Sequence, residues 1–148
     1  IPNISPPPFW RDALQKDVPV DRWQICEFLE PCSVNIDVGV SPVENGDTLE
    51  SHDSGVRGFV IDSMTPETET SCHYFWGMAR NFSIEDQGLT ERIKNGQYKI
   101  FHEDIDILEG QQKSIADNPD MSLRILSIDS GGAHARKVIK KLMELENG

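Results

Sequence analysis

The sequence has little positive charge and no long run of apolar residues. Lys and Arg total 14 against 25 Asp and Glu, so the formal net charge is −11. Such an acidic surface repels phosphate backbones and anionic lipid, which argues against nucleic acid or a membrane as a partner. No apolar run approaches the ~20 residues that a membrane-spanning helix requires. The opening residues, IPNISPPPFW, lack the plan of a signal peptide, so we expect a cytoplasmic protein.

Cysteine is also scarce in the chain. Cys26, Cys32 and Cys72 are odd in number, and no CxxC or HxxxH motif stands near them to complete a metal site. We therefore interpret the three cysteines as buried thiols rather than as metal ligands or a disulfide.

The chain starts without Met and with the proline-rich stretch Pro6–Pro8 close by, which is typical of a truncated or processed boundary. Residues 1–20 are predicted to form an extended lead-in segment with little room for a long helix, because proline lacks the amide that a helix interior needs. With 148 residues, of which 37% are hydrophobic, the chain suits a single domain with an ordinary core.

The residues that follow the lead-in alternate between apolar and polar side chains, which is the period of a half-buried β-strand. Short turns are expected at Glu30–Cys32 and Thr65–Thr68, and a polar surface loop at residues 41–54 around Asn45-Gly46. The strands predicted between these turns cover residues 23–29, 34–40, 58–64 and 70–78.

After residue 83 the apolar period becomes helical, and proline is missing until Pro119. Ser83-Ile84-Glu85-Asp86 is typical of a helix start, so the pattern predicts one long helix, bent near Gly96 or Gly110. A short strand is expected at residues 123–128, followed by a final amphipathic helix that begins at Asp129 or Ser130. Strands first and long helices last predict an α+β fold, in which a curled antiparallel sheet packs on a long C-terminal helix.

One carboxylate falls on the apolar stripe of the predicted long helix. At 100° per residue, Asp104 shares a face with Ile100 and Leu108. An unpaired carboxylate that faces a core costs several kcal/mol unless an arginine, several donors or a metal ion compensates it. Two interpretations remain open. Asp104 is either a structural carboxylate, paired with Arg80 or Arg92 or placed outside the core by a different helix phase, or the carboxylate of a two-histidine, one-carboxylate Fe(II) site.

The four histidines do not complete such an iron site by their positions in the sequence. His52 falls in the polar loop, His102 lies roughly 200° around the helix from Asp104, and His134 lies near the lysines and arginine of the last helix. His73 differs, because it stands in a predicted strand among aromatic residues. An aromatic-lined pocket is one way to hold a planar ligand, although a hydrogen-bonded core histidine is the commoner case.

Several motifs of the chain are specific in combination, namely PPFWRDAL, VDRWQICEF, TPETETSCHYFWGMARNF, GQYKIFHEDIDILEGQQ and LSIDSGGAHARKVIKKL. Together they resemble the C-terminal catalytic domain of the vanillate O-demethylase oxygenases, which are Rieske-type non-haem iron oxygenases. The resemblance covers nearly the whole chain. It implies a helix-grip fold, an antiparallel sheet curled around a long helix, which agrees with the order of strands and helices.

The resemblance also implies roles for two residues. The ED pair of the family's long helix supplies the carboxylate iron ligand, which falls on Asp104, and the histidine of HYFWG, a substrate-pocket residue in relatives, falls on His73. Family members also carry an N-terminal Rieske domain, with CxH and CxxH ligands for a [2Fe-2S] cluster, and two histidine iron ligands ahead of PPFW. None of these stands in residues 1–148, which are therefore expected to be one portion of a catalytic domain, weak in iron binding and inactive alone.

The intact protein would, by this resemblance, be a monooxygenase that takes electrons from an NAD(P)H-dependent reductase or a ferredoxin. The electrons would pass through the [2Fe-2S] cluster to a mononuclear Fe(II). With O2 the enzyme would hydroxylate the methoxy carbon of an aromatic such as vanillate, and the hemiacetal would collapse to a phenol and formaldehyde. A homotrimer is expected for the intact protein. The alternative is a non-catalytic helix-grip module that binds an apolar or aromatic small molecule, for which a buried Asp104 has no use.

Overall fold

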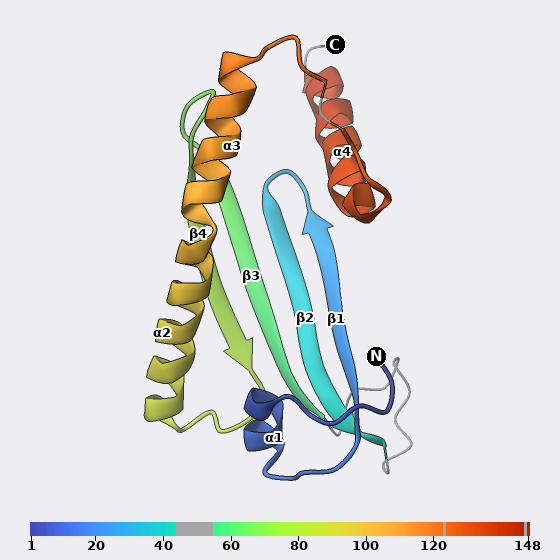
Figure 1. Ribbon diagram of the computed structural model, residues 1–148, viewed down its shortest axis with the longest axis vertical. Helices are drawn as coiled ribbons and strands as arrows, with labels where there is room; N and C mark the ends of the chain where they lie inside the picture. The colour runs from blue at the N-terminus through green and yellow to red at the C-terminus, as the bar shows by residue number, and fades with distance from the viewer. Residues whose placement is uncertain (44–54, 123, 147) are drawn as a thin grey trace. The chain divides into compact units, whose positions relative to one another are not determined.

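The computed structural model describes residues 1–43, 55–122, 124–146 and 148. Its contacts divide the chain into two compact units, Ile1–Ile84 and Glu85–Gly148. The first unit contains the β-sheet and the second contains the long helices, as the colours of Figure 1 show along the chain. The predicted α+β class with an antiparallel sheet is confirmed, whereas the packing of the sheet on a long helix stays a prediction.

Four antiparallel strands form a twisted sheet in the order in which they occur in the chain (Figure 1). The predicted turn at Glu30–Cys32 is confirmed, and the second turn lies later than predicted because the third strand continues to Pro66. Of the predicted polar loop at residues 41–54, Ser41 and Pro42 belong to the second strand, and residues 44–54, with His52, lie outside the described residues. The strands are β1 (Val20–Leu29), β2 (Ser33–Pro42), β3 (Val56–Pro66) and β4 (Cys72–Arg80).

The register between the strands sorts their side chains onto two faces, because residues directly opposite one another point to the same side. All even-numbered strand residues share one face, which we call the valine face. Val20 and Val40 there are completely buried, and Val60 is buried as well. All odd-numbered strand residues share the other face, which includes His73 and which we call the histidine face.

On the histidine face, the indole of Trp23 lies over Gly39. A Cβ at Gly39 would stand only 2.4 Å from the indole and 2.5 Å from the carbonyl oxygen of Val56, so a larger residue does not fit. The indole Nε1 donates a 2.9 Å hydrogen bond to Asp37, and Arg57 Nε donates a 2.8 Å bond to the same carboxylate oxygen. The carboxylate of Asp37 in β2 is thus bonded by one side chain of β1 and one side chain of β3.

The lead-in segment contains one short helix, α1 (Pro8–Leu14), which agrees with the prediction that no long helix fits there. Proline at the first helical position has the φ angle that a helix start requires, and Gln15 ends the helix with a φ of 54°. The ring of buried Trp10 packs edge-on against Phe9 and Phe82, with centroids 5.0 and 6.2 Å away. These aromatic contacts anchor α1 to the chain that follows β4.

The second unit contains α2 (Gln87–Glu103), α3 (Ile105–Asp117), a short 3-10 helix (Ser127–Asp129) and α4 (Ser130–Glu146). A helix does follow the predicted signature, but it begins at Gln87 and its cap is Asp86 rather than Ser83, with the Asp86 carboxylate accepting a 2.8 Å bond from the amide of Leu89. The prediction of one helix bent near a glycine is wrong. The helix is interrupted at Asp104, which has φ −90° and ψ −14°. Aspartate favours helix ends over helix interiors, because its side chain competes for backbone groups.

The predicted strand at residues 123–128 is also wrong over the residues that the structure describes. Residues 124–126 have no regular structure, and the 3-10 helix follows at Ser127. The Asp129 carboxylate turns back to accept a 2.9 Å bond from the amide of Leu126, so a local side-chain bond competes with extended backbone. The predicted start of the last helix at Asp129 or Ser130 is confirmed.

The cysteines are free thiols, as predicted, but they are not all buried. Cys26 and Cys72 are exposed and Cys32 is half-buried. Cys26 and Cys72 lie on β1 and β4, the two outer strands of the sheet. Of the described helices, none is both long enough and apolar enough to cross a membrane.

We expect the replacement Gly39→Ala to lower the free energy of unfolding by about 1–3 kcal/mol, because its methyl group would overlap both the Trp23 indole and the backbone of β3. Urea unfolding of both proteins measures this difference. The matched control is Gly77→Ala in β4, where an added Cβ meets nothing within 4 Å among the described residues. A Gly39 variant as stable as the Gly77 variant would contradict the close packing of Trp23.

Candidate functional site

Asp104, the predicted carboxylate ligand, lies at the junction of α2 and α3. Its backbone carbonyl accepts a 3.0 Å bond from Leu108, which starts the first turn of α3. The Asp104 side chain is exposed, and the neighbours of its stripe are 53% (Ile100) and 60% (Leu108) exposed, so the expectation that this stripe faces an apolar core stays a prediction. The stripe itself exists, but α2 and α3 bury no residue, and a stripe is buried only where another element packs on it.

Among the described residues, the structure shows no ion pair between Asp104 and either of the arginines that the structural alternative named. Arg80 donates 2.9 Å bonds to the carbonyl oxygens of Phe82 and Ser83. Arg92 lies 3.8 Å from the carboxylate of Asp86. The choice between a structural carboxylate and an iron ligand therefore stays a prediction. No described residue forms an ion pair with the Asp104 carboxylate.

The described histidines do not join Asp104 in a metal site. The ring of His102 stacks on Tyr98 with centroids 3.7 Å apart, and its Nδ1 lies 2.8 Å from the carbonyl oxygen of the same residue. His134 is exposed on α4, as expected for a surface position. Among the described residues, no three His, Cys, Asp or Glu side chains stand close enough to hold one metal ion. The part of the chain that the structure describes thus offers one candidate iron ligand and does not fit a complete iron site.

His73, the predicted substrate-pocket residue, lies near the start of β4 on the histidine face. Its side chain is 58% exposed, and Nε2 lies 3.7 Å from the Glu67 carboxylate. Its ring centroid is 6.2 Å from that of Phe75, the next residue on the same face. Glu67 lies in the turn between β3 and β4, and it is the folding of this turn that brings its carboxylate close to the imidazole. The sequence pattern therefore did not single it out.

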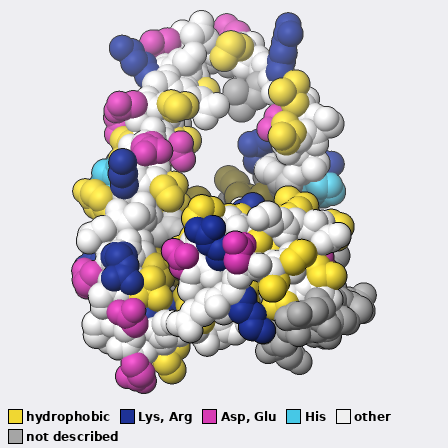
Figure 2. Space-filling model, turned by 60° about the horizontal axis from the view of Figure 1, so that its bottom comes forward, with side chains coloured by type: hydrophobic (Ala, Val, Ile, Leu, Met, Phe, Trp, Pro, Cys, Tyr) yellow, Lys and Arg dark blue, Asp and Glu magenta, His cyan; other side chains and the backbone are white. Residues whose placement is uncertain are grey.

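The neighbourhood of His73 combines aromatic, apolar and hydroxyl groups. On this face Phe75 lies opposite Ser63 of β3, and Ser63 lies opposite Ser33 of β2. The hydroxyl oxygens of the two serines are 3.2 Å apart. Exposed apolar side chains continue across this face, with Phe75 60% and Ile61 52% exposed. The histidine face around His73 is chemically suited to a planar, partly polar ligand. In the view of Figure 2, apolar side chains also stand among acidic and basic ones at the surface.

A buried carboxylate on the other face of the sheet was missed from the sequence. Asp62 is 7% exposed on the valine face and accepts a 2.7 Å bond from the hydroxyl group of Tyr74. The signal was available, because Asp62 has the same strand parity as Val60 and therefore points into the core. The tyrosine hydroxyl satisfies this acid, so it is a structural pair on the face away from His73.

Comparison with known proteins assigns the chain to a family. The family model of the vanillate O-demethylase oxygenase C-terminal domain matches residues 1–145. The chain is 47% identical to the vanillate O-demethylase oxygenase subunit of Pseudomonas sp. (strain ATCC 19151), over 97% of the chain and 45% of the relative. It is 28% identical to the dicamba O-demethylase oxygenase component of Stenotrophomonas maltophilia, over 98% of the chain and 41% of the relative.

A further relative is a toluene-4-sulfonate monooxygenase system iron-sulfur subunit of Comamonas testosteroni, 34% identical over 86% of the chain and 37% of the relative. No solved structure matches the chain. The chain spans less than half the length of these curated relatives. Because the family model covers almost every residue and the identity exceeds 30% over nearly the whole chain, the chain belongs to the vanillate O-demethylase oxygenase C-terminal domain family.

Proposed function

We propose that residues 1–148 are the catalytic-domain portion of the oxygenase component of a Rieske non-haem iron monooxygenase that O-demethylates a methoxy-aromatic such as vanillate. The observation that carries this proposal is the family match over residues 1–145, together with 47% identity to a vanillate O-demethylase oxygenase subunit. The other relatives are named as oxygenase components or as an iron-sulfur subunit of a monooxygenase system. Their names support the assignment to an oxygenase component, without specifying vanillate. Such a component requires a separate electron donor, a reductase or a ferredoxin.

Asp104 would supply the carboxylate ligand of the mononuclear Fe(II). Its side chain is exposed, has no ion-pair partner among the described residues and is held at a helix junction, so its oxygen atoms are free to bind a cation. The two histidine ligands would come from a preceding part of the longer protein, as in the family that the chain resembles. The iron would supply the activation of O2, and the described residues alone do not hold it.

His73 would orient the aromatic substrate. The imidazole has Glu67 3.7 Å from its Nε2 and the ring of Phe75 6.2 Å away between centroids, so a polar group and an aromatic ring are both close to it. An aromatic ring can pack against Phe75 while a polar ring substituent bonds to the imidazole. Ser63 lies directly opposite Phe75 on β3 and Ser33 lies opposite Ser63 on β2, so the two serines add hydroxyl groups across the histidine face.

The alternative is a helix-grip module that binds a ligand without catalysis. The burial of Asp104 does not distinguish this module from an oxygenase. Asp104 is exposed, so a structural cost of burying it no longer argues against a simple binding module. Family membership favours the oxygenase instead, because the relatives are named for reactions rather than for binding. Iron content and turnover of the longer protein distinguish the two functions.

In the full-length protein, we expect Asp104→Ala to lower the affinity for mononuclear iron and the turnover of a methoxy-aromatic by at least about 100-fold. The loss of a residue that orients a metal ligand already costs up to about 100-fold, and the loss of the ligand itself costs no less. Iron analysis and formaldehyde release measure the effect, and the visible absorbance of the [2Fe-2S] cluster should stay unchanged. The control is Asp106→Ala, two residues along in the first turn of α3. Equal iron content in both variants would remove Asp104 from the iron site.

We expect His73→Ala in the full-length protein to reduce kcat/KM for the aromatic substrate by about 10–100-fold, the worth of one hydrogen bond to a charged or strongly polar group. Iron and cluster content should not change, since His73 would contact only substrate. Cys72→Ala serves as the control, because the adjacent side chain lies on the valine face. A His73 variant with normal kcat/KM, or with iron lost, would contradict the substrate role.

A further inference from the structure

The first four residues of the chain run antiparallel along the outer edge of β1. Ile4 and Val20 exchange two backbone hydrogen bonds of 2.9 Å. Arg22 donates a 2.8 Å bond to the carbonyl oxygen of Ile1, and the N-terminal nitrogen of Ile1 donates a 2.5 Å bond back to Arg22. The exchange of both bonds in each pair is the pattern of an antiparallel ladder rather than of a chance contact.

A bulge interrupts the one-to-one pairing of this short ladder, and the pairing resumes after it. Two residues, Pro2 and Asn3, stand opposite the single residue Asp21, and Asn3 takes a φ of 51°. The amide of Asn3 donates a 2.7 Å bond to the Asp21 carboxylate, so the extra residue keeps a hydrogen-bond partner. After the bulge the ladder is restored at Ile1, and the chain direction carries any preceding residue toward Gln24.

The outer edge of β1 continues beyond Arg22 with the same alternation of backbone groups. No described residue pairs with this part of the edge. Backbone groups of a strand alternate between its two sides, and Val20 and Arg22 point outward. Gln24, Cys26 and Phe28 therefore also direct their N–H and C=O groups outward. Buried or partly buried backbone groups without partners are costly, and open edges are normally covered.

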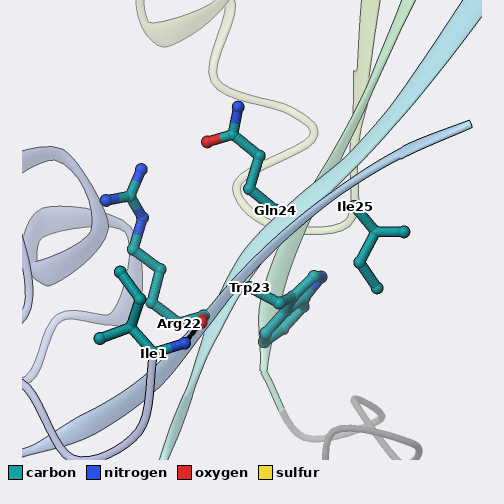
Figure 3. Close-up of a pocket in the computed structure, with 5 residues that line it drawn as sticks. All are labelled: Ile1, Arg22, Trp23, Gln24 and Ile25. Carbon is teal, nitrogen blue, oxygen red and sulfur yellow. Dashed lines mark hydrogen bonds between the residues drawn. The ribbon is translucent and has the colours of Figure 1, made fainter. Parts of the chain in front are cut away.

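A hollow marks the same place. It has a volume of about 390 Å³ and is lined by Ile1, Arg22, Trp23, Gln24 and Ile25. In Figure 3, Arg22 and Gln24 extend from one side of β1, and Trp23 and Ile25 from the other. Arg22 Nε is buried and has no hydrogen-bond partner among the described residues. A backbone carbonyl of an added strand is the kind of acceptor that this donor lacks.

We propose that the outer edge of β1 from Gln24 to Phe28 binds a fifth, antiparallel strand, formed by the polypeptide that precedes Ile1 in the longer protein. The second residue before Ile1 would pair with Gln24, and alternate residues before it with Cys26 and Phe28. Two observations identify the occupant. The ladder at Ile1 is already continuous with this edge. The relatives contain more than half of their length outside the part that matches this chain, and the matching family model is that of a C-terminal domain.

This inference rests on the proposed function only in requiring a longer chain. It requires neither iron at Asp104 nor an aromatic substrate at His73, so a backbone measurement tests it without turnover. A second copy of the 148-residue chain is the competing occupant, since an open edge can also pair with its own kind.

The decisive experiment is amide hydrogen exchange at single-residue resolution, on the full-length protein and on the 148-residue chain at several concentrations. We expect the amides of Gln24, Cys26 and Phe28 to exchange at least about tenfold more slowly in the full-length protein. The amides of Ile25 and Glu27 face β2 and serve as internal controls, protected in both proteins. Equal exchange at Gln24, Cys26 and Phe28 in both proteins would overturn the proposal, as would protection in the short chain that grows with dimer formation.

A pair of variants separates the backbone from the side chain. Cys26→Pro removes an outward amide that an edge strand can lack, so the 148-residue chain should tolerate it. In the full-length protein the same change removes a ladder bond, and the protection of Gln24 and Phe28 should fall to the level of the short chain. Cys26→Ala keeps the amide and should leave that protection intact. Protection that survives proline and is lost with alanine would mean that the thiol, not the backbone edge, forms the contact.

Discussion

The carboxylate of Asp37 holds three strands of the sheet together. The indole of Trp23 and the guanidinium of Arg57 both bond to it, and Arg57 also stacks 4.3 Å from the ring of Phe59. A one-residue slip of β1 or β3 would move its partner to the opposite face and leave this half-buried carboxylate without donors. Because the register is fixed at this point, the valine face and the histidine face are fixed across β1, β2 and β3, and β4 continues them through its pairing with β3.

The two faces then serve different purposes. Buried valines and the Tyr74–Asp62 pair stabilise the valine face. The histidine face keeps exposed apolar groups, and Phe75 beside His73 is more than half exposed. Monomeric proteins seldom leave such groups uncovered without a role, so this face suits a ligand or another part of a longer protein. The apolar stripe around Asp104 presents the same pattern on a helix.

The open edge of β1 is the place where a further strand is proposed to join the sheet. The relatives extend well beyond the matching part, and the described residues contain one candidate iron ligand instead of three. A strand added at β1 would join the preceding polypeptide to the sheet that carries His73. The catalytic site and the missing edge strand would then both depend on residues outside this chain.

The sequence alone predicted the antiparallel α+β class, the strands, a long helical region after residue 83 and the family, because period, turn residues and motifs are local features. It did not predict the exposure of Asp104 or of Cys26. Helical phase says which side chains share a stripe, and only tertiary packing decides whether anything covers that stripe. The same holds for Glu67 beside His73 and for the bond from Tyr74 to Asp62, since strand register and turn geometry bring these residues together.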